Sequence, residues 1–223
     1  MGLRIEAADL VMGYHTLCAN APRRKQSFLS VNRKGVAPVD KTARRLEERL
    51  AMALFNQREI AFENGSVLRI LDYQFPLKSK SIDRSVGKID LLGLSDKGRL
   101  AIVELKVADN REDRRVALVE GLIYAAIVEA NLKEIAAEVT AMHGYQVETA
   151  RPAILLLAPA DFWSSPRCQP PVADVSRLAT AVSTQIPIDI SLLSLEGAEL
   201  TDLGADGTRP TLSRNVTMSP VRT

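Results

Sequence analysis

Residues 87–107 read GKIDLLGLSDKGRLAIVELKV, two apolar runs (87–95 and 99–107) on either side of a short polar segment. That segment, residues 96–98, has the sequence Asp-Lys-Gly. A three-residue loop that ends in glycine is a common hairpin connection, because glycine adopts the left-handed backbone conformation that other residues resist. The pattern therefore predicts a β-hairpin centred on Lys97.

This hairpin brings ionisable residues together. A turn centred on Lys97 pairs Asp90 with Glu104, and the alternation of a strand places Lys106 on the same face as Glu104. Cross-strand partners have Cβ atoms about 4.5 to 5.5 Å apart. Two carboxylates that close repel each other unless one is protonated or a cation lies between them, and hard divalent ions prefer oxygen ligands. The pair therefore indicates a Mg²⁺ site, and the alternative is a structural ion pair of Lys106 with Glu104 or Asp90.

The segments around the hairpin alternate between helical and strand-like periodicity, which indicates an α/β fold with a mixed sheet. They predict one domain over residues 39–203, with an irregular leading arm at 1–38 and a flexible tail at 204–223. The expected elements are a helix at 39–56, strands at 66–77, 87–95 and 99–107, helices at 110–131 and 131–144, a strand at 150–159, a helix at 171–185 and a strand at 188–197.

Composition narrows the functional class. The chain has 223 residues, of which 46% are hydrophobic and 25% charged, as in ordinary globular proteins. Cys18 and Cys168 form no CxxC pattern, which disfavours a disulfide framework or a cysteine-bound metal and fits the cytoplasm. We expect no membrane partner, because the chain has no apolar run of membrane-spanning length and no signal-peptide pattern. Walker A and GxGxxG loops are also missing, so we expect no nucleotide cofactor.

The charge is unevenly distributed along the chain. Although the formal net charge is only +2, residues 23–58 carry ten Lys and Arg against three acidic residues. Clustered basic side chains favour a polyanionic partner, because binding releases the counterions of phosphate groups. The alternative is an ordinary basic helix face in contact with solvent.

Asp90, followed after thirteen intervening residues by Glu104-Leu105-Lys106, resembles the signature of the PD-(D/E)XK nuclease superfamily, with Ile89 in place of the proline. The resemblance implies a three-layer α/β/α restriction-endonuclease-like core with a central mixed β-sheet. It also implies that Asp90, Glu104 and the Leu105 carbonyl bind Mg²⁺, with Mn²⁺ as a substitute. Lys106 would orient or activate the attacking water.

The resemblance extends to residues on the neighbouring helices. A Glu on the first helix usually faces the site, and we expect this to be Glu47 rather than Glu48, because Glu47 lies at the margin of the apolar stripe. On the helix after the hairpin, Glu120 stands where many members have Gln, and Tyr124 follows four residues later. The alternative for Glu47 and Glu120 is an ordinary role on a helix surface.

The sequence thus predicts a Mg²⁺-dependent nuclease that hydrolyses DNA, with endonuclease action favoured and a homodimer suited to double-strand cutting. Two alternatives stay open: a catalytically silent nucleic-acid-binding or assembly module with the same fold, and an ion-pair network in an unrelated α/β protein. The residues expected to contact the nucleic acid are Arg44, Arg45, Arg111, Arg114, Arg115 and Tyr124.

Overall fold

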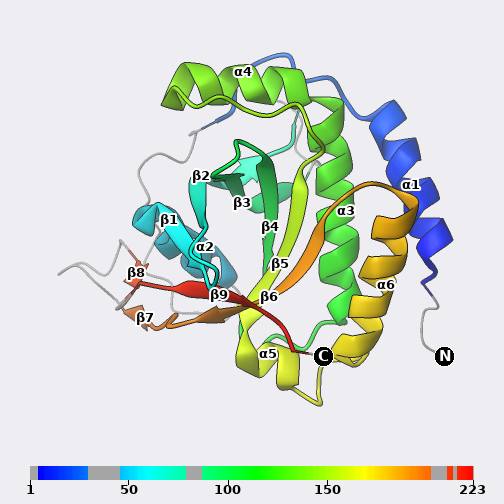
Figure 1. Ribbon diagram of the computed structural model, residues 1–223, viewed down its shortest axis with the longest axis vertical. Helices are drawn as coiled ribbons and strands as arrows, with labels where there is room; N and C mark the ends of the chain where they lie inside the picture. The colour runs from blue at the N-terminus through cyan, green and yellow to red at the C-terminus, as the bar shows by residue number, and fades with distance from the viewer. Residues whose placement is uncertain (1–4, 30–45, 79–86, 202–209, 213–214, 223) are drawn as a thin grey trace.

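The computed structural model describes residues 5–29, 46–78, 87–201, 210–212 and 215–222 (Figure 1). The helices of this part are α1 (Ala7–Asn20), α2 (Leu46–Gln57), α3 (Arg114–Ala130), α4 (Leu132–His143), α5 (Ala160–Ser164) and α6 (Val172–Gln185). Its strands are β1 (Glu59–Phe62), β2 (Val67–Pro76), β3 (Lys88–Ser95), β4 (Leu100–Leu105), β5 (Ala153–Pro159), β6 (Ile190–Glu196), β7 (Leu200–Thr201), β8 (Thr211–Leu212) and β9 (Thr217–Pro220).

Seven of these strands form a closed barrel in the order β1-β2-β3-β4-β5-β6-β9. Strands β1 to β4 are antiparallel neighbours, whereas β4, β5 and β6 run parallel. Strand β9 closes the barrel, because it pairs antiparallel with β6 and parallel with β1. Strands β7 and β8 form a separate two-stranded sheet.

The expected three-layer α/β/α core is therefore wrong: the described strands close into a barrel instead of forming an open central sheet. Strands β1 and β9, which pair with each other in the closed barrel, were not predicted. Both have only four residues, and β9 lies within the segment 204–223, which was expected to be a flexible tail. Met218 of β9 is nevertheless fully buried. The expected irregular arm also differs, since residues 7–20 form helix α1.

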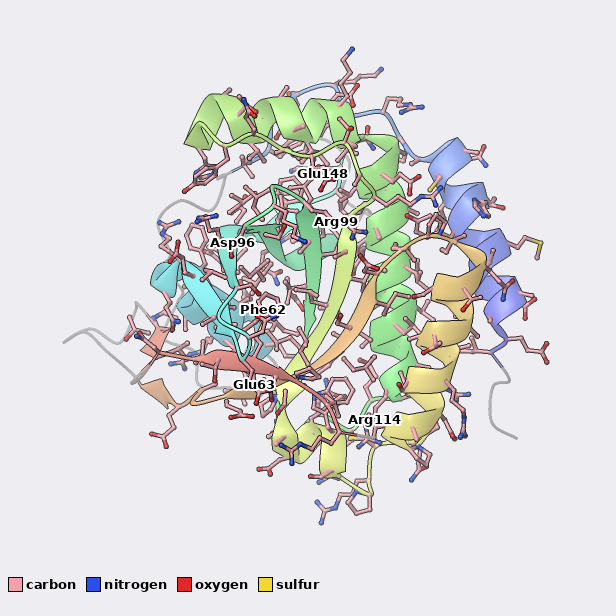
Figure 2. The ribbon with its side chains drawn as sticks, in the orientation of Figure 1. Phe62, Glu63, Asp96, Arg99, Arg114 and Glu148 are labelled. Atoms are coloured by element: carbon pink, nitrogen blue, oxygen red, sulfur yellow. The ribbon has the colours of Figure 1, made fainter. Side chains whose placement is uncertain are left out.

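The predicted hairpin is confirmed. Leu91 pairs with Val103 and Leu94 with Leu100, which is the register of a turn centred on Lys97. Gly98 has φ 81° in that turn, and its amide donates a 2.9 Å hydrogen bond to the Ser95 carbonyl. Figure 2 shows Asp96, Arg99 and Glu148 gathered at this end of the hairpin. Asp90 and Glu104 lie toward the opposite end of strands β3 and β4.

Apolar side chains pack on both faces of the strands. One face of all seven barrel strands packs with α2 around Leu54, Phe55 and Leu157. The opposite face of β2 to β5 packs against α1, α3, α4 and α6. Figure 1 shows α1, α3 and α6 side by side, away from α2. Helices α2 and α3 therefore approach β3 and β4 from different sides. Among the described residues, no helix is long and apolar enough to cross a membrane.

If β9 belongs to the packed barrel, Met218→Ala lowers the free energy of unfolding by about 2 to 5 kcal/mol, because it leaves a cavity among buried side chains. Met12 on α1 is 65% exposed, and Met12→Ala serves as the matched control, with an expected change within about 0.5 kcal/mol. Urea unfolding measures both values. Equal stability of the two variants would show that β9 is not packed.

Candidate active site

Asp90 lies on β3, one residue beyond the last β3–β4 pair, Leu91 with Val103. Its carboxylate takes the place of a backbone partner at this position. Oδ2 accepts a 2.9 Å hydrogen bond from the Leu105 amide, and Oδ1 accepts one of the same length from Nε2 of Gln74 on β2. Asp90 is thus held between β2 and β4 at the point where the hairpin ladder ends.

Glu104 and Lys106 lie side by side at the end of β4, and only 5% and 6% of their surfaces are exposed. The Lys106 ammonium is 3.1 Å from Oε1 of Glu104 and 3.2 Å from Oε2 of Glu120 on α3. A third carboxylate, that of Glu112 in the loop before α3, is 3.1 Å away. A buried cation therefore has acidic partners on a strand, a loop and a helix.

Glu47 of α2 faces the same site, whereas Glu48 is exposed. Glu47 Oε1 accepts a 2.7 Å hydrogen bond from Asn110, which belongs to the loop between β4 and α3. Its charge raises the pKa of both Asp90 and Lys106. We refer to Glu47, Asp90, Glu104, Glu112 and Glu120 as the acid cluster.

Tyr124, one turn after Glu120 on α3, packs against the backbone at the start of β3. A Cβ atom at Gly87 would lie only 2.8 Å from Cε1 of the Tyr124 ring, so the glycine permits this close approach. Burial, together with the negative charge of Glu104 and Glu120, raises the pKa of the Tyr124 phenol. Tyr124 therefore stays protonated and forms part of the wall of the site.

Burial and mutual repulsion shift the ionisation of the cluster. Burial raises the pKa of Asp90 to about 6, against the opposing effects of the Leu105 amide and Lys106. Burial and the charge of Asp90 raise the pKa of Glu104 well above its ordinary value. Burial alone would lower the pKa of Lys106, but Glu104, Glu120 and Glu47 together raise it. Lys106 is therefore an ammonium, and its single positive charge faces several carboxyl groups.

The donor chemistry of this cluster fits a hard divalent cation, because carboxylate and carbonyl oxygens are the ligands that Mg²⁺ prefers. The side-chain arrangement places the Lys106 ammonium where such an ion would neutralise Glu104. Within the described ranges, no three His, Cys, Asp or Glu side chains are grouped closely enough to hold a metal ion. The Lys106 ammonium lies 3.1 Å from Oε1 of Glu104, so an ion that binds this oxygen would displace the ammonium.

The residues expected to contact nucleic acid have different environments. Arg44 and Arg45 lie outside the described residues. Arg111 is exposed, whereas the guanidinium of Arg115 is bound by Asp113, with Nε 2.9 Å from Oδ1. Arg114 is only 2% exposed, so its expected contact with nucleic acid is wrong. Its guanidinium donates to the backbone carbonyls of Phe162, Trp163, Ser165, Cys168 and Pro170.

Figure 2 shows Arg114 near the first turn of α3, beside the segment that contains α5. Its role is to hold this segment against α3. The basic stretch 23–58 is also partly structural, because Arg24 is 8% exposed and forms a buried ion pair with Glu138 on α4. The sequence shows the charge of such residues. It does not show which carbonyl and carboxylate groups bind them after folding.

Sequence reasoning missed two residues that contact the site, Gln74 and Glu112. Gln74 is one of three polar side chains, with Arg69 and Asp72, in the mostly apolar run 67–76, so nothing in the sequence singles it out. Glu112 lies in a charged loop with several acidic residues and nothing to distinguish it. Only the folded positions of β2 and of the loop identify them.

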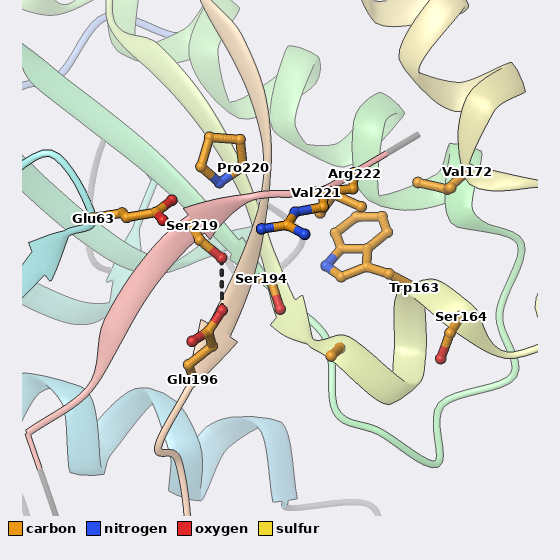
Figure 3. A pocket seen from close by; sticks show the side chains of 11 residues that line it. Glu63, Trp163, Ser164, Val172, Ser194, Glu196, Ser219, Pro220, Val221 and Arg222 are labelled. Carbon is orange, nitrogen blue, oxygen red and sulfur yellow. Dashed lines mark hydrogen bonds between the residues drawn. The ribbon is translucent and has the colours of Figure 1, made fainter.

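A pocket of about 370 Å³ lies elsewhere, between α5, β6 and β9. Figure 3 shows Trp163, Ser194 and Arg222 around it, and Ser219 donates a 2.8 Å hydrogen bond to Glu196. Because none of its lining residues belongs to the acid cluster, this pocket does not mark the candidate site.

Comparisons with protein-family models, with curated proteins and with solved structures give no match for this chain. The function of the protein is therefore inferred from the site itself.

The raised pKa of Asp90 predicts a pH effect in the protein without divalent ions. Its carboxyl binds a proton more tightly in the fold, with a pKa of about 6, than in the unfolded chain, where 3.8 is ordinary. Ionisation thus favours unfolding, and the free energy of unfolding falls as pH rises from about 4 to about 6. Urea unfolding in EDTA measures this fall, which Asp90→Asn reduces. Parallel curves for both proteins would contradict the shift.

The buried position of Arg114 predicts that Arg114→Met lowers the free energy of unfolding by at least about 2 kcal/mol, because backbone carbonyls lose their donors. The control is Arg111→Met, at the exposed neighbouring arginine, which should change it by no more than about 0.5 kcal/mol. Thermal or urea unfolding tests this difference, and equal stability of the two variants would rule out a structural role for Arg114.

Proposed function

We propose that the protein is a metal-dependent nuclease that hydrolyses phosphodiester bonds, with DNA as the substrate and Mg²⁺, or Mn²⁺ in its place, as the ion. The observation that carries this proposal is the burial of Lys106 and Glu104 beside Asp90, with further acids arriving from α2 and α3. The Asp90…Glu104-x-Lys106 pattern, which resembles that of the PD-(D/E)XK nucleases, supports it at the level of the site. The expected restriction-endonuclease-like fold gives it no support.

In this proposal Asp90, Glu104 and the Leu105 carbonyl hold the ion, while Glu47 and Glu120 add negative charge around it. A bound ion would polarise the scissile phosphate and lower the pKa of a water. Water adds across the P–O bond, so one product carries the phosphate and the other a hydroxyl. Because its pKa is raised, Lys106 donates hydrogen bonds that orient the water or stabilise phosphate oxygens, and does not act as the base.

The basic residues expected on the surface around the site give the proposal weaker support. Among the described residues of our expected set, Arg111 in the loop between β4 and α3 is the most exposed, and it could contact a phosphate backbone. Such a contact would position DNA without selecting a sequence. Endonuclease action, a homodimer and a cytoplasmic location belong to the same proposal.

The test is cleavage of linear and circular DNA, single- and double-stranded, with Mg²⁺, Mn²⁺ or EDTA. We expect metal-dependent cutting by the wild type and a loss of about a hundredfold or more in Lys106→Met and Asp90→Asn, which remove a donor and a carboxylate at the reacting centre. Lys133→Met, at an exposed lysine of α4, is the matched control and should cut at the wild-type rate. Circular dichroism verifies that each variant is folded.

Two other outcomes would contradict the proposal. A wild type that binds DNA but leaves every substrate intact would indicate a silent nucleic-acid-binding or assembly module. If the protein neither cuts nor binds DNA, and no divalent ion changes its stability, the contacts of Lys106 with Glu104 and Glu120 form a structural ion-pair network.

A further inference from the structure

We propose that Gln74 is a positioning residue of the acid cluster, held in an unfavourable backbone conformation so that its amide fixes the Asp90 carboxylate for a divalent cation. This inference rests on the proposed function, because it assigns Gln74 to the same ion site. Its basis is the path of β2, a strand that the Asp…Glu-x-Lys pattern does not include.

The first observation is a change of register in β2. Leu68, Arg69 and Ile70 pair with β3 in one register, and the pairs from Asp72 onward are shifted by one residue through a bulge. Continuing the first register would place Tyr73 opposite Asp90. In the shifted register Tyr73 pairs with Leu91 and Phe75 with Ile89, so Gln74 is opposite Asp90. The extra residue in β2 therefore exchanges a phenol for an amide at this position.

The second observation is the backbone at Gln74 itself. Its φ is 47°, in the left-handed region that residues with a Cβ atom avoid outside special positions. A local conformation of this kind persists only where the surrounding structure imposes it, and such residues gather at functional sites. The bulge between Ile70 and Asp72 and the positive φ of Gln74 thus lie within a few residues of each other. Gln74 is itself the hydrogen-bond partner of Asp90.

The third observation is the contact that results. Nε2 of Gln74 lies 2.9 Å from Oδ1 of Asp90, while the Leu105 amide lies 2.9 Å from Oδ2. Each carboxylate oxygen has two lone pairs, so both hydrogen bonds leave Asp90 able to bind a cation. Donors of this kind orient a ligating carboxylate, and their loss typically weakens metal binding about 10- to 100-fold.

The test compares Gln74→Gly and Gln74→Met with the full-length wild type, using Mn²⁺ titration calorimetry and urea unfolding. Glycine accepts a positive φ, so Gln74→Gly should keep or raise the urea midpoint and yet weaken Mn²⁺ binding by about 10- to 100-fold. Methionine keeps the length and the strain but has no donor, so Gln74→Met should weaken binding to the same extent. Arg58, the other residue described with a positive φ besides glycines, has φ 75° and lies over the Phe55 ring. Arg58→Gly is the control and should leave Mn²⁺ affinity unchanged.

Wild-type Mn²⁺ affinity in both Gln74 variants would overturn the inference and leave the proposed function intact. A parallel fall in stability and affinity in Gln74→Gly would also overturn it, because a purely structural residue behaves in that way. A wild type that binds no Mn²⁺ would overturn the proposed function, and this inference with it.

Discussion

The ammonium of Lys106, buried among the carboxylates of Glu104, Glu112 and Glu120, is the constraint on which the rest of the site depends. A buried charge is costly unless it is paired, and even a well-paired buried ion pair often adds no more stability than apolar side chains of similar size. Strand β4 is otherwise apolar and fully buried from Leu100 to Val103. Stability alone therefore gives little reason for Glu104 and Lys106 at its end, whereas a site that binds a cation and a phosphate does.

The fold supplies partners for these charges from separate elements. The β3–β4 hairpin brings Asp90 to the end of β4, α2 contributes Glu47, and α3 with its preceding loop contributes Glu112 and Glu120. Helices α2 and α3 belong to different apolar cores on the two faces of the strands. The acid cluster thus takes side chains from helices of both cores, and the packing of each core positions one of these helices.

Local features of the sequence predicted the centre of this arrangement. The Gly98 turn fixes the hairpin register, and strand alternation then brings Asp90, Glu104 and Lys106 together. Features that depend on distant partners could not be predicted in this way. Met218 is buried because β9 meets β1 and β6, a pairing that leaves no periodic signal in four residues. Arg114 was predicted to contact phosphate. The backbone carbonyls that accept its hydrogen bonds are distant in the sequence, so its buried position could not be foreseen. The bulge of β2 left no recognised signal either, so Gln74 was missed.

The most direct test of a cation site built around Lys106 is a crystal structure of the protein with Mn²⁺, using the anomalous signal of the metal to locate it. The account predicts a peak between Asp90 and Glu104, with the Lys106 ammonium no longer in contact with Glu104 and still held by Glu112 or Glu120. A structure without a peak at this place, in which Lys106 keeps its contact with Glu104 at saturating Mn²⁺, would contradict it.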